Sequence, residues 1–123
     1  MDTPDSLQGL PSIDLSFLRV YSGGNNALMK KFIDAFLERT PAAVAAMEEQ
    51  LAAKDYHGLS RSAHSLKPQF SYVGVPKAPE LTKSIEESAK EVRDVESIPA
   101  QLDELKSILS KAYNELQHQL TLL

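Results

Sequence analysis

The stretch YHGLSRSAHSLKPQFSYVG, residues 56–74, decides the fold, because its apolar side chains recur at the spacing of one helical face. These apolar positions are separated by four, three, four and three residues, and they are Leu59, Ala63, Leu66, Phe70 and Val73. Such a stripe is typical of an amphipathic helix that packs against a core. We therefore predict a helix over residues 56–74, with Asp55 as its N-terminal cap and Gly74 at its end.

The polar side of the same helix carries a histidine. At about 100° per residue, His64 lies roughly 140° from the centre of the apolar stripe, so we expect its imidazole to face water. Arg61 and Lys67, each three residues away, flank it. Ser60 and Ser71 are small residues on this side and leave room for another molecule to approach. Taken alone, an exposed histidine beside a lysine is an ordinary solvated pair.

The run AHSLKPQFSYVG, residues 63–74, resembles the signature of the histidine-containing phosphotransfer (HPt) domain, roughly A-H-x-L-K-G-x-x-x-x-x-G. The positions that match are Ala63, His64, Leu66, Lys67 and Gly74. Pro68 stands where the family usually has glycine. The resemblance implies a helical bundle whose exposed histidine carries a phosphoryl group between the aspartates of response-regulator receiver domains.

The resemblance also assigns roles to the residues of this helix. His64 is the expected phospho-acceptor, which suits its chemistry, because free imidazole has a pKa of about 6.5 and is largely neutral and nucleophilic near pH 7. Lys67 is expected to neutralise part of the phosphate charge. Arg61 either contacts the phosphate or the receiver or only pairs with a surface acid, and the sequence leaves both open. The expected docking surface consists of three small or compact residues, Ser60, Pro68 and Ser71.

Two residues depart from the family pattern. Pro68 lacks the amide that would bond to the carbonyl of His64, and its ring crowds that carbonyl, so we expect a bend there. Glu86, on the next helix, stands where many relatives carry glutamine or another polar residue. An acid at that position would repel phosphate if it lay close, unless Lys83 or Lys67 offsets it.

Length and composition bound the kind of protein. The 123 residues suffice for one domain with a single core. The net charge of −4 and the pI near 5.3 argue against a nucleic-acid binder, whose affinity would rest on neutralising phosphates. No apolar run approaches the ~18 residues of a membrane span. Cysteine is absent, which removes disulfides and thiolate metal ligands. We expect a cytoplasmic protein without membrane contact.

The remaining chain reads as further helices. A short helix is expected over residues 13–21, and a second begins near Asn25 or Asn26. Thr40 and Pro41 predict a helix restart, with a capping hydroxyl and a proline at the first helical position. The next helix begins near Pro79, and its apolar side is expected to be Leu81, Ile85, Ala89 and Val92.

Ser97 is the expected cap of a long final helix that runs to the end of the chain. The short connections favour an all-α fold, an antiparallel four-helix bundle with a short additional N-terminal helix. Residues 1–12 are expected to form a flexible leader, and residues 13–123 the bundle domain.

The sequence offers no intrinsic cofactor site, since it has no Gly-rich nucleotide loop and no evident cage of carboxylates for Mg²⁺. The resemblance implies that the receiver brings the metal, so we expect a phosphocarrier that does not use ATP by itself. His57 lies seven residues before His64, too far to share one metal ion with it. The expected partners are receiver domains and a hybrid histidine kinase, with the protein acting as a monomer.

A second interpretation stays open at this point. The chain would then be a non-catalytic helical interaction module, which docks receivers or other helices without being phosphorylated. A hydrolytic or metal enzyme is disfavoured, because the sequence lacks the paired acids and ligand sets that such chemistry needs.

Overall fold

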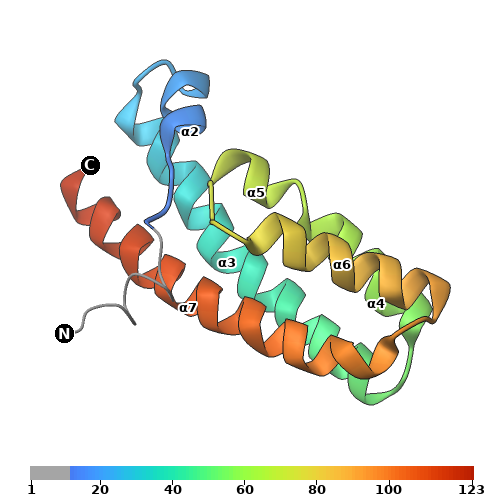
Figure 1. Cartoon of the computed structure of the whole chain (residues 1–123). Coiled ribbons are helices and arrows are strands. Elements are labelled where there is room, and N and C mark those ends of the chain that lie inside the picture. Colours follow the sequence, from blue (N-terminus) through green and yellow to red (C-terminus); the bar gives the residue numbers. More distant parts are fainter. Residues whose placement is uncertain (1–11) are drawn as a thin grey trace.

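Four main helices run up, down, up and down in the computed structural model, which describes residues 12–123 (Figure 1). They are α3 (Asn26–Ala52), α4 (Tyr56–Leu66), α6 (Ala78–Glu91) and α7 (Ile98–Leu122). Three short helices accompany them, α2 (Ser16–Tyr21), α5 (Gln69–Tyr72) and the 3₁₀ helix η1 (Val95–Ser97). The predicted all-α antiparallel bundle with a short additional N-terminal helix is confirmed. The leader predicted for residues 1–12 lies, apart from Ser12, outside the described residues.

Each main helix packs against two others. α4 lies against α3 and α6, and α7 closes the bundle against the other side of the same two helices. The apolar stripe predicted for α4 and its continuation is buried throughout. Its members meet the apolar faces of the other helices, whose largest fully buried side chains include Met29, Ile33, Phe36, Met47, Ile85, Leu105, Leu109 and Leu116. Burial of each such side chain contributes about 1.5–3 kcal/mol. No helix in the described part of the chain is long and apolar enough to cross a membrane.

α3 continues through Pro41, so the predicted helix restart at this point is wrong. The hydroxyl of Thr40 does not cap a new helix but donates to the carbonyl of Phe36, at 2.6 Å. Proline removes only the amide that would bond to the carbonyl of Leu37. The helix survives because Phe36, Thr40 and Val44 are buried on one face, and tertiary packing outweighs the local preference for a break.

The helix predicted over residues 56–74 is divided in two. α4 ends at Leu66, and α5 begins again at Gln69. Between them Pro68 has no amide hydrogen to donate, and the carbonyl of His64 accepts instead from the amide of Lys67, at 3.3 Å. The bend expected at Pro68 is therefore a full break, which turns the chain immediately after the histidine.

Helix ends follow the expected chemistry at several points. The side chains of Asn25 and Asp55 accept from the amides of Leu28 and Gly58, both at 3.0 Å, and cap α3 and α4. Ser97 occupies the position before α7 but donates to the carbonyl of Asp94 rather than capping with its side chain. Val92, predicted on the apolar side of α6, is exposed instead. It follows the last residue of α6 with a φ of 50°, and this left-handed turn takes it away from the apolar face.

Candidate functional site

His64 lies on the outer side of α4. Its side chain is 71% exposed, whereas Ala63 before it and Leu66 after it are buried in the core. The predicted orientation of the histidine away from the apolar stripe agrees with this exposure. Burial of one α4 face thus fixes the helix rotation and holds the imidazole at the surface.

Glu86 of α6 contacts both His64 and Lys67. Its Oε2 atom lies 2.8 Å from Nδ1 of His64, and its Oε1 atom lies 2.9 Å from Nζ of Lys67. The carboxylate is positioned by its neighbour Ile85 and by Ala89, which are both buried against the rest of the bundle. One carboxylate therefore orients the ring and the ammonium group together.

The charge of Glu86 is stabilised by these two contacts. The side chain is only 17% exposed, and burial by itself would raise the pKa of its carboxyl group. The hydrogen bonds and attraction from Lys67 and His64 outweigh that effect, so the pKa of Glu86 is lowered from 4.5. Glu86 is therefore ionised at neutral pH.

An ionised carboxylate accepts hydrogen bonds and cannot donate them. The 2.8 Å contact therefore places a proton on Nδ1 of His64. In the neutral ring the lone pair then resides on Nε2. Within residues 12–123 no group is hydrogen-bonded to Nε2, so its lone pair is open to an approaching molecule.

Two shallow hollows lie beside the imidazole. The first is lined by His64, Lys67, Pro68, Phe70, Ser71, Pro79 and Lys83. The second is lined by His57, Ser60, Arg61, His64, Ser65, Glu86, Ala89, Lys90 and Val92. His64 borders both hollows, so a partner can approach the ring from either side.

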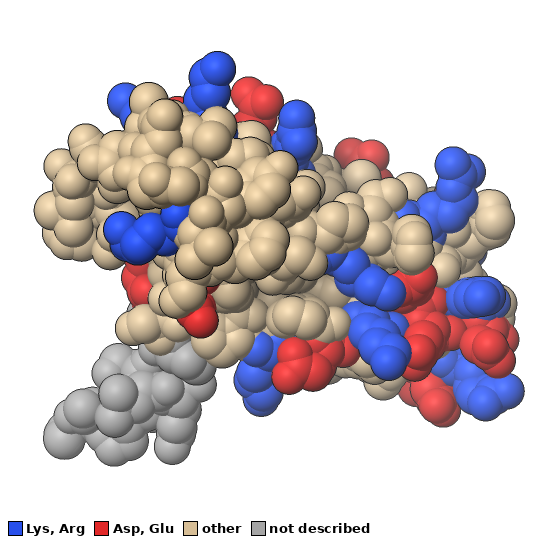
Figure 2. Space-filling view, turned by 90° about the horizontal axis from the view of Figure 1, so that it is seen from above, with Lys and Arg blue, Asp and Glu red and all other residues tan. Residues whose placement is uncertain are grey.

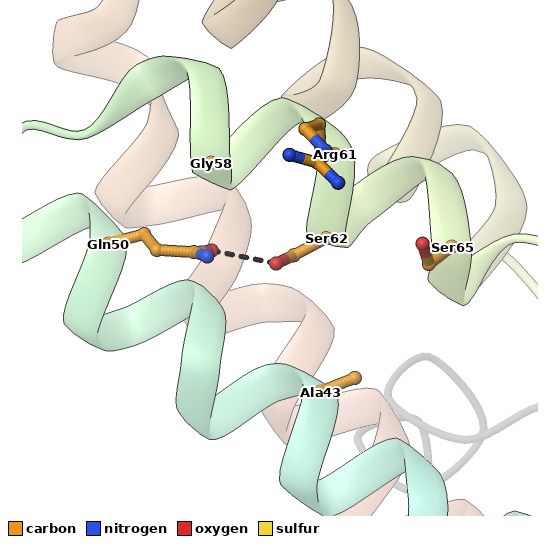
Figure 3. Close-up of a pocket in the computed structure, with 6 residues that line it drawn as sticks. All are labelled: Ala43, Gln50, Gly58, Arg61, Ser62 and Ser65. Carbon is orange, nitrogen blue, oxygen red and sulfur yellow. Dashed lines mark hydrogen bonds between the residues drawn. The ribbon is translucent and has the colours of Figure 1, made fainter.

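Arg61 borders a third hollow, between α3 and α4 (Figure 3). There Gln50 and Ser62 are joined by a hydrogen bond of 2.8 Å, while Ala43 and Gly58 leave the groove open. Among residues 12–123 no acidic side chain forms an ion pair with Arg61. The alternative that Arg61 only pairs with a surface acid is therefore not supported within residues 12–123.

Charged side chains are spread unevenly over the face of the molecule that Figure 2 shows. In the view of Figure 2, the end that carries α2 shows mostly uncharged side chains, whereas basic and acidic groups gather over the opposite end. The uncharged end includes an aromatic cluster in which Tyr72 stacks on Phe32 and meets Phe17 and Tyr21 edge to face. Phe17 and Tyr21 are both exposed.

Comparison with known proteins identifies the family. The pattern of the Hpt domain family matches residues 31–119. The chain belongs to the Hpt domain family. A crystal structure of the HPT domain from a sensor hybrid histidine kinase of Shewanella has the same fold, with a TM-score of 0.76 at 22% identity over 95% of this chain and 97% of that one. Among curated proteins the comparison gives no significant match.

Family membership establishes the kind of function. An Hpt domain is a histidine phosphotransfer module of two-component phosphorelays, and it is a phosphocarrier rather than an autonomous kinase. The interpretation of the chain as a module of this type is thus confirmed. Receiver domains are the class of partner that such a module implies.

The predicted site residues of this Hpt domain separate into two groups. Pro68, Ser71 and Lys67 share the first hollow with His64, and Ser60 and Arg61 share the second. All five residues therefore lie beside His64, but on two different sides of it. Among residues 12–123 the structure contains no group of three or more His, Asp or Glu side chains placed to hold a metal ion.

Glu86 is the residue whose role the sequence did not reveal. The sequence predicted an acid that would repel phosphate if close, unless Lys83 or Lys67 offset it. Lys67 does pair with Glu86, at 2.9 Å, but the contact of Glu86 with the imidazole of this Hpt domain was not foreseen. Its place immediately after the buried Ile85 was the available signal, since it puts Glu86 at the edge of the face that α6 packs on α4. The distance to His64 depends on how the two helices cross, which the sequence does not specify.

Proposed function

We propose that this Hpt domain accepts a phosphoryl group on Nε2 of His64 from the aspartyl phosphate of one receiver domain and passes it to the aspartate of another. The observation that supports this most directly is the state of the ring. His64 is 71% exposed, and its Nδ1 is engaged by Glu86 at 2.8 Å, which leaves the lone pair on the opposite nitrogen.

The transfer forms one bond and breaks one. The lone pair of Nε2 attacks the phosphorus atom in line, the bond from phosphorus to the aspartate oxygen breaks, and its electron pair leaves with the aspartate carboxylate. Transfer to the second receiver is the reverse reaction. Neither step consumes ATP. Because the phosphoryl group comes from one receiver and goes to another, the chain needs a receiver partner for each step.

Lys67 supports the phosphoryl group as it arrives. Its ammonium group has three donors, of which one is used on Glu86 at 2.9 Å. The others are available to phosphoryl oxygens, and the side chain is 37% exposed. Arg61 borders the second hollow and supplies further positive charge to the phosphate or to the acidic pocket of the receiver. We expect Mg²⁺ to come with the receiver.

Docking requires that a receiver aspartate reach covalent range of His64. Three small or compact residues border the hollows, namely Ser60, Pro68 and Ser71. Their side chains do not project far enough to obstruct a receiver that approaches His64. The aromatic cluster beside α5, with Phe17 and Tyr21 exposed, offers an apolar contact for the rest of the receiver.

A hybrid histidine kinase is the expected donor, because the Shewanella domain of the same fold belongs to such a kinase. We expect the domain to act as a monomer in the cytoplasm. Sedimentation at the concentration of the transfer assay checks the monomer.

The experiment uses a receiver domain labelled with radioactive acetyl phosphate. Mixed with the parent protein, His64→Gln and His57→Gln, it should label the parent and His57→Gln with an acid-labile phosphate and leave His64→Gln unlabelled. His57 is the matched control, since it is an exposed histidine of the same helix that borders the same hollow. Persistent label in His64→Gln would remove His64 as the acceptor.

A further inference from the structure

The two hollows beside His64 differ in chemistry. The lining of the first hollow includes two exposed proline rings, those of Pro68 and Pro79, together with the buried Phe70. Polar or charged side chains make up most of the lining of the second hollow. Since proline has no amide hydrogen to donate, one side of the imidazole suits an apolar group and the other suits a polar one.

The backbone fixes both proline rings of the first hollow. Pro68 lies in the break between α4 and α5, where the carbonyl of His64 accepts from the amide of Lys67 instead. Pro79 is the second residue of α6, a position at which its missing amide has no helical partner to lose. A proline side chain loses no rotamer freedom when another group covers it. Contact with these rings therefore has a smaller entropic cost than contact with a long flexible side chain.

Lys83 adds a positive charge to the same hollow. It lies three residues before Glu86, and therefore one turn away on the same side of α6, and Glu86 contacts His64 at 2.8 Å. The other lysine of this hollow, Lys67, is held by Glu86 at 2.9 Å. Among residues 12–123 no acidic side chain forms an ion pair with Lys83. Lys83 is thus the cation of this hollow that is available to a carboxylate of a partner.

We propose that the first hollow determines which receivers this Hpt domain accepts. It takes one apolar side chain that the receiver carries beside its phosphorylated aspartate, and Lys83 pairs with a carboxylate next to that side chain. Pro79 and Lys83 are then specificity-determining residues. This inference rests on the proposed function, because it takes His64 as the acceptor and a receiver as the donor. It adds the side of the imidazole that the receiver covers and the two features that are recognised there.

The surface that adjoins the first hollow indicates that a receiver is its occupant. Phe70 and Ser71, which line the hollow, belong to α5, and the next residue of α5 is Tyr72. Tyr72 belongs to the aromatic cluster and meets the exposed Phe17 of α2 edge to face. The hollow therefore has His64 on one side and is joined through α5 to the exposed apolar surface of α2. A molecule that rests on that surface and brings phosphate to His64 also covers the hollow.

A kinetic test compares the apolar lining with a matched position elsewhere, using transfer from a labelled receiver. Pro79→Ser removes an apolar ring from the hollow and should lower the second-order rate constant of transfer about fivefold. Pro99→Ser is the control, because Pro99 is the exposed second residue of α7 and lines neither hollow. It should change the rate constant by less than about twofold.

The role of Lys83 is tested in the same assay. Lys83→Glu reverses the charge that faces the receiver and should lower the rate constant about tenfold. Lys90→Glu is the control, because it makes the same change at an exposed position of the same helix that borders the second hollow. High salt screens long-range attraction, so the rate of Lys90→Glu should approach that of the parent. The loss in Lys83→Glu should persist, because two carboxylates in contact are screened less.

NMR of the parent protein identifies the occupant without any substitution. The domain carries isotope-labelled proline, and the receiver is unlabelled and held in a mimic of its phosphorylated state by beryllofluoride and Mg²⁺. Methyl or aromatic protons of the receiver should give intermolecular nuclear Overhauser effects to the rings of Pro68 and Pro79 and none to Pro99. A mixture of labelled and unlabelled domain without receiver should give none, which excludes a second copy of this chain as the occupant.

Three results would each overturn this pocket while leaving His64 as the acceptor. They are equal rates of Pro79→Ser and Pro99→Ser, full recovery of Lys83→Glu at high salt, and the absence of receiver effects at Pro68 and Pro79. Effects in the domain-only mixture would assign the hollow to a second copy instead. Phosphoramidate, a small phosphoryl donor, should label His64 in every variant, and the NMR result decides for any variant that it fails to label. A parent protein that takes no phosphate on His64 would overturn the proposed function itself.

Discussion

Asp14 and Gly74 exchange two backbone hydrogen bonds, from the amide of Asp14 to the carbonyl of Gly74 at 2.8 Å and from the amide of Gly74 to the carbonyl of Asp14 at 2.9 Å. This pairing ties the segment before α2 to the chain that follows α5. A Cβ atom added at Gly74 would lie 2.9 Å from the Cβ of Asp14 and 3.0 Å from its carbonyl oxygen. The glycine that ends the family signature thus has a structural reason in this chain, which is the close approach of two backbones.

We predict that Gly74→Ala destabilises the fold by about 1–3 kcal/mol, because both neighbouring atoms belong to Asp14 and the segments must move apart. Denaturant unfolding followed by circular dichroism measures the change. Ser110→Ala, an exposed substitution on α7, is the control and should change stability by less than about 0.5 kcal/mol. Equal stability of Gly74→Ala and the parent would show that the pairing is not tight.

Pro41 should be a weak point of α3. Pro41→Ala restores a donor inside a continuous helix and should raise stability by about 1–2 kcal/mol, since proline in a helix interior is disfavoured by about 3 kcal/mol relative to alanine. Pro99→Ala is the matched control, because Pro99 lies in the first turn of α7, where the missing amide has no partner in any case. A loss of stability in Pro41→Ala would mean that the proline shapes the packing of α3.

The fold was predictable where burial and local chemistry agree. The stripe from Leu59 to Val73 repeats at helical spacing and is buried, and Asn25 and Asp55 cap the helices that they were expected to cap. Pro41 misled the sequence reading because packing on the neighbouring helices overrides a local break. A sequence pattern shows the local conformational preference of each segment. It does not show how strongly tertiary packing contacts oppose that preference.

The site was predictable only along one helix. His64, Lys67 and Arg61 lie on α4 or at its end, where periodicity fixes their relative positions. The contact between His64 and Glu86 joins two helices, and its 2.8 Å distance depends on their crossing angle and separation. Spacing within one chain segment cannot supply that geometry, so the contact between Glu86 and His64 could not be predicted from the sequence.

Lys67→Ala should slow phosphoryl transfer from a labelled receiver by about two- to tenfold, because it removes the charge that faces the incoming phosphate and one of the two contacts of Glu86. Stability should fall by at most about 1 kcal/mol, since the ion pair is partly exposed. Rapid-quench kinetics and denaturant unfolding measure the two effects. Lys106→Ala removes a lysine paired with Glu48, away from His64, and should transfer at the parental rate. A large loss of stability with normal transfer would assign Lys67 to the fold alone.

Acid should remove the stabilisation that Glu86 provides. Because its pKa in the folded protein is lowered from 4.5, its contribution is fully present above that value and is lost as the pH falls through the folded pKa. The stability of the parent relative to Glu86→Gln should therefore be greatest near neutral pH and shrink from about pH 5 downwards. Urea unfolding of both proteins across that range measures the difference. A difference that grows on acidification would contradict the sign of the shift.

Ser71→Arg should block transfer although it adds favourable charge. Ser71 is exposed and borders the hollow that it shares with His64, so a long side chain there occupies the space a receiver needs. Charge would raise the rate of encounter with an acidic partner, but that effect is steering and weakens with salt. Transfer requires the aspartyl phosphate to come within bonding distance of Nε2. We therefore expect steric obstruction by the arginine to outweigh its electrostatic attraction of the receiver. Ser110→Arg adds the same charge at an exposed position on α7, which contributes no residue to the hollow, and should transfer normally. If Ser71→Arg bound and transferred as well as Ser110→Arg at both low and high salt, receivers would have to approach His64 from the side of Ser60 and Arg61.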